Sequence, residues 1–244
     1  MNRFSITLLL LFVLTFGCQS EELPKPHEDM QEQPNPPVLP LTYLALGDSY
    51  TIGEGVSPAE RYSEQLKDSL QKAGIGLGAV TILARTGWTT DDLSRAMDAA
   101  EFFPPYDMVS LLIGVNNQYR GRSPENFRGE FVGLLQRAIS LAGDHADRVV
   151  VISIPDWGVT PFAQGRDKEQ IAREIDAYNA VKKEETLRLG VAWVDVTPIS
   201  RRADQQPELL ALDGLHPSGL MYHLWMREIF PIALPILTQQ NDHE

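Results

Sequence analysis

Short apolar segments alternate with longer stretches of helical character from residue 41 to residue 237, and this alternation limits the possible folds more than any other feature. Most of the apolar segments are near-continuous runs, which is typical of parallel strands that are covered on both faces. The alternation predicts an α/β fold, a three-layer α/β/α sandwich around a five-stranded parallel sheet with right-handed crossovers. The predicted strands are Thr42–Leu46, Ala79–Ala84, Met108–Ile113, Arg148–Ile154 and Val191–Val196.

The stretches between these strands carry residues that begin and end helices. Ser123 is a predicted N-cap before Pro124, because proline is favoured at the first helical position. Thr90 begins another stretch with acidic residues in its first turn, where they favour the helix dipole, and Gly74 ends a third stretch. The predicted helices are Ala59–Ala73, Thr90–Phe102, Pro124–Ala142, Lys168–Leu189 and Gly219–Phe230.

The N-terminal residues have the pattern of an export signal. Arg3 gives residues 1–17 a positive start, and the apolar stretch 4–16 is shorter than the roughly 20 residues of a membrane-spanning helix. Cys18 follows as the only cysteine of the chain, in a context that resembles a bacterial lipobox. We therefore predict a lipoprotein signal peptide, with an ordinary secretory signal as the alternative. Gln19 after the cysteine favours the outer membrane, by resemblance to envelope lipoproteins.

Composition divides the chain into segments and limits its partners. Residues 18–40 contain six prolines and several acids without apolar periodicity, so they are predicted to form an extended tether. Residues 41–237 are predicted to be one domain, and residues 238–244 a polar tail. The chain has 21 basic and 33 acidic side chains and a net charge of −12, which argues against nucleic acid as a partner. The predicted contact with a membrane is through the N-terminal lipid alone.

The turn Gly47-Asp48-Ser49 follows the first predicted strand at its carboxyl end, where open α/β sheets bind their ligands. Gly47 permits a sharp turn, and Ser49 can present its hydroxyl while its backbone N–H stays free. Asp48 is expected to brace the loop by accepting hydrogen bonds from backbone N–H groups. These features predict a nucleophilic serine. Gly, Asp and Ser are also ordinary turn residues, so a plain strand-to-helix turn is the alternative.

Loops after the other strands supply groups that a nucleophilic serine needs. Of the five histidines, His216 alone lies in a loop that the predicted topology brings near Ser49. Asp213 stands three residues earlier and can accept from the other ring nitrogen, which would make His216 the base for the serine. Attack on an ester creates an oxyanion, and its predicted donors are the N–H of Ser49, the N–H of Gly87 and the Asn116 amide. Turn formation and capping are the alternative roles of Gly87 and Asn116.

These motifs resemble those of the SGNH/GDSL hydrolase family, and the resemblance covers roughly residues 42–232. Residues 47–50 are similar to the first block of the family, Gly87 to the second, residues 114–117 to the third and residues 213–216 to the last. Four separate loops that each match are more specific than any single motif.

The resemblance implies the flavodoxin-like fold of SGNH hydrolases and a carboxylic ester hydrolase, with Ser49 as nucleophile, His216 as base and Asp213 as its partner. The sequence departs from the family pattern twice. Tyr50 stands in place of the leucine of the naming motif, and Asn117 stands where many members have aspartate. The chain has no metal-binding motif, and the expected chemistry needs neither a metal nor a cofactor.

The loops also suggest the kind of substrate. No long insertion separates the five predicted strands, so we expect a shallow groove. Such a groove favours short acyl groups or carbohydrate O-acetyl esters, and the ester could belong to a small molecule or to a glycan. Trp88, Tyr119, Trp157 and Phe162 lie in or near the predicted rim, where they could stack on a sugar ring or lipid chain. Packing beneath the loops is their other role. A lysophospholipase or lipase-like esterase, an acyltransferase and a non-catalytic glycan-binding lipoprotein are the alternative functions.

Overall fold

The structure is a computed structural model and describes residues 39–241 of the chain. The predicted signal peptide, Cys18 and the tether up to residue 38 lie outside the described residues, as do residues 242–244. None of the helices in the described range combines the length and the apolar character that crossing a membrane requires.

Five parallel strands form one sheet in the order β2-β1-β3-β4-β5, which confirms the predicted α/β fold. The strands are β1 (Leu41–Gly47), β2 (Leu77–Ala84), β3 (Met108–Leu112), β4 (Val149–Ile152) and β5 (Ala192–Val194). β1 lies between β2 and β3, and its last residue, Gly47, pairs with Ala84 of β2 and Leu112 of β3. The loops that follow these three strands therefore start at the same level of the sheet.

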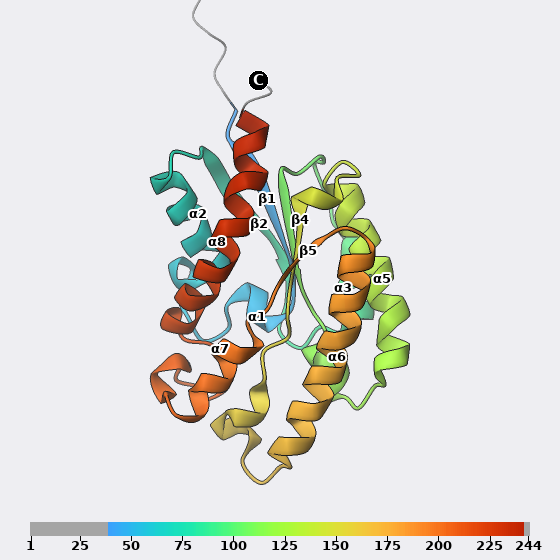
Figure 1. The fold of residues 1–244 in the computed structure, drawn as a ribbon, viewed down its shortest axis with the longest axis vertical. Helices are drawn as coiled ribbons and strands as arrows, with labels where there is room; N and C mark the ends of the chain where they lie inside the picture. Colours follow the sequence, from blue (N-terminus) through green and yellow to red (C-terminus); the bar gives the residue numbers. More distant parts are fainter. Residues whose placement is uncertain (1–38, 242–244) are drawn as a thin grey trace, which may run out of the picture. The chain divides into compact units, whose positions relative to one another are not determined.

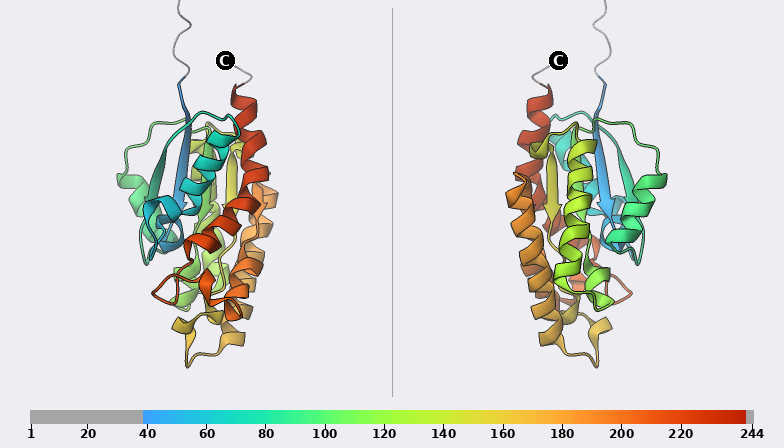
Figure 2. Two further views of the ribbon diagram at one scale, coloured as in Figure 1. Left: turned by 90° about the vertical axis from the view of Figure 1, so that its left-hand side faces the viewer. Right: turned by 90° about the vertical axis from the view of Figure 1, so that its right-hand side faces the viewer.

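Helices cover both faces of the sheet and complete the three layers (Figure 1, Figure 2). α2 and α8 lie side by side on one face, whereas α3, α5 and α6 cover the other. The helices are α1 (Ser49–Ile52), α2 (Tyr62–Lys72), α3 (Thr90–Ala99), α4 (Val115–Tyr119), α5 (Pro124–Leu141), α6 (Lys168–Arg188), α7 (Thr197–Arg201) and α8 (Gly219–Asn241). α2, α3, α5 and α6 agree with the predicted helices to within three residues at each end.

α8 differs most from its predicted bounds, because it does not end at Phe230 but continues to Asn241 through Pro231 and Pro235. Each proline lacks the N–H that would close a helical hydrogen bond, and this usually breaks or kinks a helix. The second half of α8 nevertheless keeps a buried apolar stripe at a spacing of four residues, formed by Ile229, Ala233 and Leu237. Burial of this stripe against the core offsets the lost hydrogen bonds, so the helix continues.

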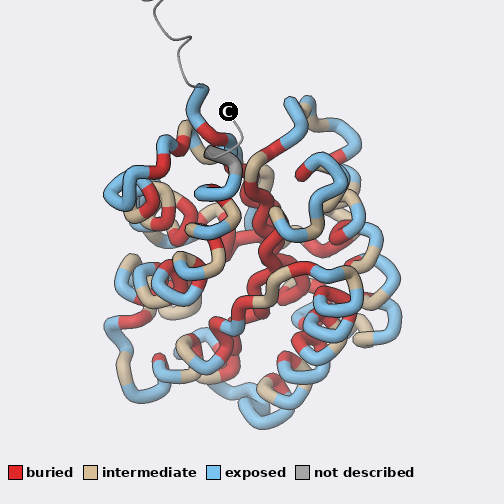
Figure 3. The backbone as a smooth tube through the Cα atoms, turned by 45° about the horizontal axis from the view of Figure 1, so that its top comes forward, coloured by how far each residue is buried: buried red, intermediate tan, exposed pale blue. Residues whose placement is uncertain are grey.

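The most completely buried part of the molecule is the centre of the sheet (Figure 3). Every residue of β3 and β4 is buried, whereas the edge strands β2 and β5 are partly exposed. This explains why the central strands are continuous apolar runs in the sequence. The loops at the ends of β1 and β3 therefore extend from the best-packed elements of the fold.

Candidate active site

The chain turns sharply at the end of β1, and α1 begins at Ser49. Glycine is required at position 47, because a Cβ on Gly47 would overlap the carbonyl oxygen of Leu112 in β3. Asp48 braces the turn in the way that the sequence predicts, since its Oδ1 accepts a hydrogen bond of 3.0 Å from the N–H of Tyr50. The turn thus holds Ser49 at the carboxyl edge of the sheet, and only 5% of the surface of this residue is exposed.

The loop between α7 and α8 holds His216 against Asp213. His216 Nδ1 lies 2.6 Å from Asp213 Oδ2. Asp213 Oδ1 also accepts hydrogen bonds of 3.0 Å from the backbone N–H groups of Leu215 and His216. A hydrogen bond of 2.8 Å from the Ala211 N–H to the His216 carbonyl closes the loop behind them. Asp213 therefore fixes both the loop and the imidazole.

The pKa of Asp213 is lowered from its ordinary value. Burial acts to raise this pKa, but the hydrogen bonds from the His216 ring and from the N–H groups of His216 and Leu215 have the larger combined effect. The carboxylate is therefore ionised at neutral pH and can stabilise a positive charge on the imidazole.

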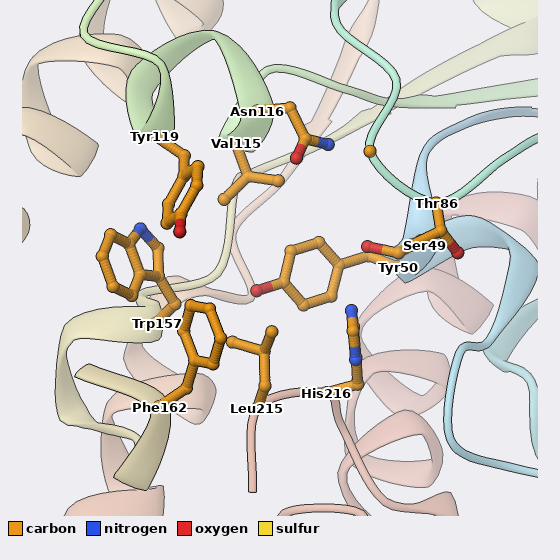
Figure 4. Close-up of a pocket in the computed structure, with 11 residues that line it drawn as sticks. Ser49, Tyr50, Thr86, Val115, Asn116, Tyr119, Trp157, Phe162, Leu215 and His216 are labelled. Atoms are coloured by element: carbon orange, nitrogen blue, oxygen red, sulfur yellow. The ribbon is translucent and has the colours of Figure 1, made fainter. Parts of the chain in front are cut away.

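Ser49 and His216 line one pocket of about 170 Å³, together with Gly87 and Asn116 (Figure 4). Ser49, Gly87 and Asn116 follow three different strands, and His216 lies in the loop before α8, so the topology brings together residues that are far apart in the sequence. Figure 4 shows a ring nitrogen of His216 on the side that faces Ser49. Within residues 39–241 the structure has no hydrogen bond between these two side chains. Such catalytic hydrogen bonds are often long without substrate and shorten when it binds.

Asn116 and Gly87 belong to neighbouring loops that are joined by a hydrogen bond. Asn116 Nδ2 donates at 2.9 Å to the carbonyl of Trp88, which ties the amide to the loop that carries Gly87. The amide has a second N–H, for which the described residues provide no acceptor, and Asn116 lines the pocket. Gly87 has a φ of 84°, and a Cβ there would meet no other atom, so the backbone conformation is what favours glycine. Its N–H, the Asn116 amide and the N–H of Ser49 are suitable donors for an oxyanion.

Asn117 is buried and does not line the pocket. Its Oδ1 accepts a hydrogen bond of 3.0 Å from the Thr90 N–H, and its Nδ2 donates at 2.6 Å to Thr90 Oγ1. These bonds join the start of α3 to α4. Asn117 therefore holds the loop that carries Gly87 beside Asn116. Although Asn117 stands where many family members have aspartate, Asn116 still lines the pocket.

Aromatic side chains form the other end of the pocket. Tyr119, Trp157 and Phe162 contact one another, with ring centroids 5.4 to 6.2 Å apart. The guanidinium of Arg166 lies 4.9 to 5.9 Å from these three ring centroids. Trp88 does not line the pocket but packs, half-buried, against the core. The structure thus brings three of the four predicted rim aromatics to the pocket and places the fourth, Trp88, against the core.

Several residues that line the pocket are missing from the set that the sequence selects. They are Tyr50, Thr86, Val115 and Leu215. The Tyr50 ring packs edge-on against the His216 ring, with the two ring centroids 5.6 Å apart. Each is next in sequence to a selected residue, and this adjacency is the signal that could have found them. Among the described residues, no group of three or more His, Cys, Asp or Glu side chains is placed to hold a metal ion.

Comparisons with known proteins identify the family of the chain. Residues 45–224 match the model of the GDSL-like Lipase/Acylhydrolase family. A search of curated proteins finds no match. Because this family model spans most of the chain and includes every residue of the site, it bears on the whole domain.

Solved structures similar to this chain share its fold at low sequence identity. A lipase/acylhydrolase from Enterococcus faecalis is 22% identical with a TM-score of 0.60, covering 82% of this chain and 96% of that one. The psychrotrophic esterase EstA from Pseudoalteromonas sp. is 16% identical with a TM-score of 0.61, covering 81% and 98%. The acetyl xylan esterase AlAXEase is 16% identical with a TM-score of 0.62, covering 78% and 98%. With the family model matched over residues 45–224, the chain belongs to the GDSL-like lipase/acylhydrolase family.

Proposed function

We propose that this protein is a serine ester hydrolase that cleaves short acyl esters or O-acetyl esters of carbohydrates. One observation carries the proposal: the imidazole of His216, bound at 2.6 Å to Asp213, lines the same pocket as the Ser49 hydroxyl and the Asn116 amide. A base that is held by a carboxylate beside a serine is the arrangement that makes a serine nucleophilic.

The proposed mechanism has two steps. Ser49 Oγ attacks the ester carbonyl while His216 accepts its proton, and Asp213 stabilises the imidazolium. The oxyanion accepts hydrogen bonds from the N–H of Ser49, the N–H of Gly87 and the free N–H of the Asn116 amide. His216 then protonates the leaving alcohol, and water releases the acyl group from the serine by the reverse sequence of proton transfers.

The size and lining of the pocket support short acyl groups. Its volume of about 170 Å³ lies below the roughly 300–1,000 Å³ of sites that enclose drug-sized ligands. Tyr119 and Phe162 at its end are exposed, so they offer flat apolar surfaces on which a sugar ring can stack. The name of one similar structure, an acetyl xylan esterase, agrees with an acetylated carbohydrate as substrate.

Substitution of the nucleophile tests the proposal directly. Ser49→Ala should lower kcat on p-nitrophenyl acetate by about 10⁴-fold or more. The matched control is Ser140→Ala, which removes an exposed hydroxyl from α5 and should leave kcat unchanged. A fluorophosphonate probe should label the wild-type protein at Ser49. Esterase activity in the Ser49→Ala variant would contradict the assignment, and a wild-type protein without label would favour a non-catalytic glycan binder.

A series of p-nitrophenyl esters from acetate to palmitate separates the proposed substrates from those of a lipase-like enzyme. We expect kcat/KM to be highest for the shortest chains, because the pocket is small. A maximum at long chains would instead favour the lysophospholipase or lipase-like alternative. Product analysis with an added sugar acceptor distinguishes hydrolysis from acyl transfer, since both use the same residues.

We also propose that the protein is exported and attached to the outer membrane by a lipid on Cys18, with residues 18–40 as its tether. The support is the apolar leader that ends at the only cysteine of the chain. Metabolic labelling with an alkyne fatty acid should mark the wild-type protein, and Cys18→Ser should abolish the label and move the protein to the soluble fraction. Equal labelling of both proteins would refute the anchor.

A further inference from the structure

α6 carries a lysine on its buried stripe. Ile171, Ile175 and Tyr178 face the core at helical spacing, and Lys182 occupies the next position of the same stripe. Its exposed fraction is 0%. Lysine is almost never fully buried unless its charge is compensated, so this position needs a partner that the helix itself does not provide.

The ammonium of Lys182 lies against the carboxyl ends of β3 and β4. Its Nζ donates hydrogen bonds of 3.0 Å to the Ile113 carbonyl, just after β3, and 2.9 Å to the Ile152 carbonyl at the end of β4. The ring of Phe131 lies 5.7 Å away. These neighbours solvate the ammonium but carry no full negative charge, so they leave its charge uncompensated.

Asp48, the residue before the nucleophile, is also 0% exposed. Its Oδ1 accepts the hydrogen bond from the Tyr50 N–H that braces the turn. Its Oδ2 is buried and, within the described residues, has no hydrogen-bond partner. A carboxylate in this position also needs a compensating charge, because a buried and unpaired oxygen is unfavourable.

Gly47 and Leu112 pair at the ends of β1 and β3, so Asp48 and Ile113, whose carbonyl binds the Lys182 ammonium, leave neighbouring strands at the same level. This placement lets the two buried charges compensate each other, although the described part of the chain has no contact ion pair between them. Burial raises the pKa of Asp48 to about 7, and the Tyr50 N–H and the charge of Lys182 act against this rise. Burial lowers the pKa of Lys182 to about 7, and Asp48 acts against that fall.

The charge of Asp48 acts on buried tyrosines of three further elements. They are Tyr50 on α1, Tyr62 on α2 and Tyr222 on α8. Burial raises the pKa of each hydroxyl above its ordinary value, so all three stay neutral and add no charge beside Asp48. Lys182 is therefore the cation that acts on Asp48 among the described residues.

We propose that Lys182 is a positioning residue for the ester hydrolysis proposed above: its ammonium favours the ionised form of Asp48, and the ionised carboxylate holds the turn that presents Ser49. A carboxylate binds a backbone N–H more strongly than a neutral acid does. With Asp48 protonated, its hold on the Tyr50 N–H weakens, and the Ser49 hydroxyl and N–H lose their fixed position. A displacement of about 1 Å at a reacting group can lower the rate about 10²-fold.

The pH dependence of kcat/KM tests this role. As the base, His216 must be unprotonated with or without Lys182. In Lys182→Met the cation is gone, so the pKa of Asp48 rises further, and the part of the acid limb that Asp48 sets should move to higher pH by about one unit. Activity should recover as the pH rises through that limb. The matched control, Lys183→Met, changes an exposed lysine on the same helix and should keep the wild-type limb. A merely structural role would lower activity by the same factor at every pH, and an unshifted limb would overturn the proposal.

Thermal unfolding gives a second test that needs no activity. Removing one partner leaves a buried charge without compensation, whereas Asp48→Asn/Lys182→Met removes both charges and keeps an oxygen for the Tyr50 N–H. The double variant should therefore melt at a higher temperature than Lys182→Met alone, and it should fold even if that single variant does not. A loss in Tm equal to the sum of the two single losses, or a double variant that fails to fold, would refute the pairing. If Ser49→Ala stays active while the double variant melts at a higher temperature than Lys182→Met, the assignment of Ser49 as nucleophile fails but the pairing of Asp48 with Lys182 stands.

Discussion

Asp213→Asn separates the charge of this carboxylate from its role in the loop. The asparagine keeps an oxygen that can accept from the Leu215 and His216 N–H groups, so the loop should stay closed. The substitution removes the negative charge beside Nδ1 of His216, at present 2.6 Å from Asp213 Oδ2. The imidazolium that forms when Ser49 attacks then lacks its counter-charge, and the ring loses the partner that fixes its tautomer.

The exposure of Asp213 determines the size of this effect. Two unit charges about 4 Å apart attract by about 1 kcal/mol in water and by about 4 kcal/mol at the dielectric near a protein surface. The Asp213 side chain is 37% exposed, so the attraction that the substitution removes lies between these two values. We place it nearer the upper value, because the imidazole itself is buried. Each 1.36 kcal/mol corresponds to about a tenfold change in rate, so kcat should fall by about 10²- to 10³-fold. Fully buried aspartates of this kind give losses of about 10⁴-fold.

The assay is kcat on p-nitrophenyl acetate, with thermal unfolding to confirm that the loop and the fold are retained. Asp68→Asn, which changes an exposed carboxylate on α2, is the matched control and should leave both quantities unchanged. A loss smaller than tenfold in a variant with wild-type Tm would refute the argument that this charge stabilises the imidazolium.

Three further substitutions test other parts of the site. Asn116→Ala should lower kcat by about 10²- to 10³-fold through loss of an oxyanion donor, whereas Asn126→Ala at the exposed start of α5 should have no effect. Gly47→Ala should lower Tm, because the added Cβ would overlap the backbone of β3. Gly129→Ala in α5 is the control: its Cβ has open space, so Tm should stay the same or rise. Equal melting temperatures of the two variants would contradict this. Phe162→Ala should raise kcat/KM for octanoate relative to acetate by opening the end of the pocket, and an unchanged ratio would show that the acyl chain does not lie there.

The sheet could be predicted from the sequence because burial on both faces leaves a continuous apolar run, as in β3 and β4. The end of α8 could not be predicted from the same information. Pro231 is a local stop signal, and the buried stripe of Ile229, Ala233 and Leu237 outweighs it only because the sheet is there to receive it. Local signals therefore locate elements well but fail where tertiary packing opposes them.

The site could be predicted as far as topology determines it. Ser49 and Asn116 follow adjacent strands and must lie at one edge of the sheet. The direction in which a loop side chain points is not fixed by topology, which is why Trp88 packs against the core while Trp157 lines the pocket. Lys182 stands on an apolar stripe that the sequence displays, but its partner belongs to another element and becomes visible only in three dimensions.

The proposed catalytic groups are each held by a separate set of hydrogen bonds, and this determines what substrate binding must still change. Asp48 holds the turn of Ser49, Asp213 holds the loop of His216, and Asn116 is tied to the loop after β2. The proposed oxyanion donors and the imidazole are therefore already held in position, as catalysis by preorganised groups requires. Within the described residues, Ser49 and His216 are not joined by a hydrogen bond, so the reaction itself must bring them together. Loosening a brace should therefore lower kcat more than it raises KM.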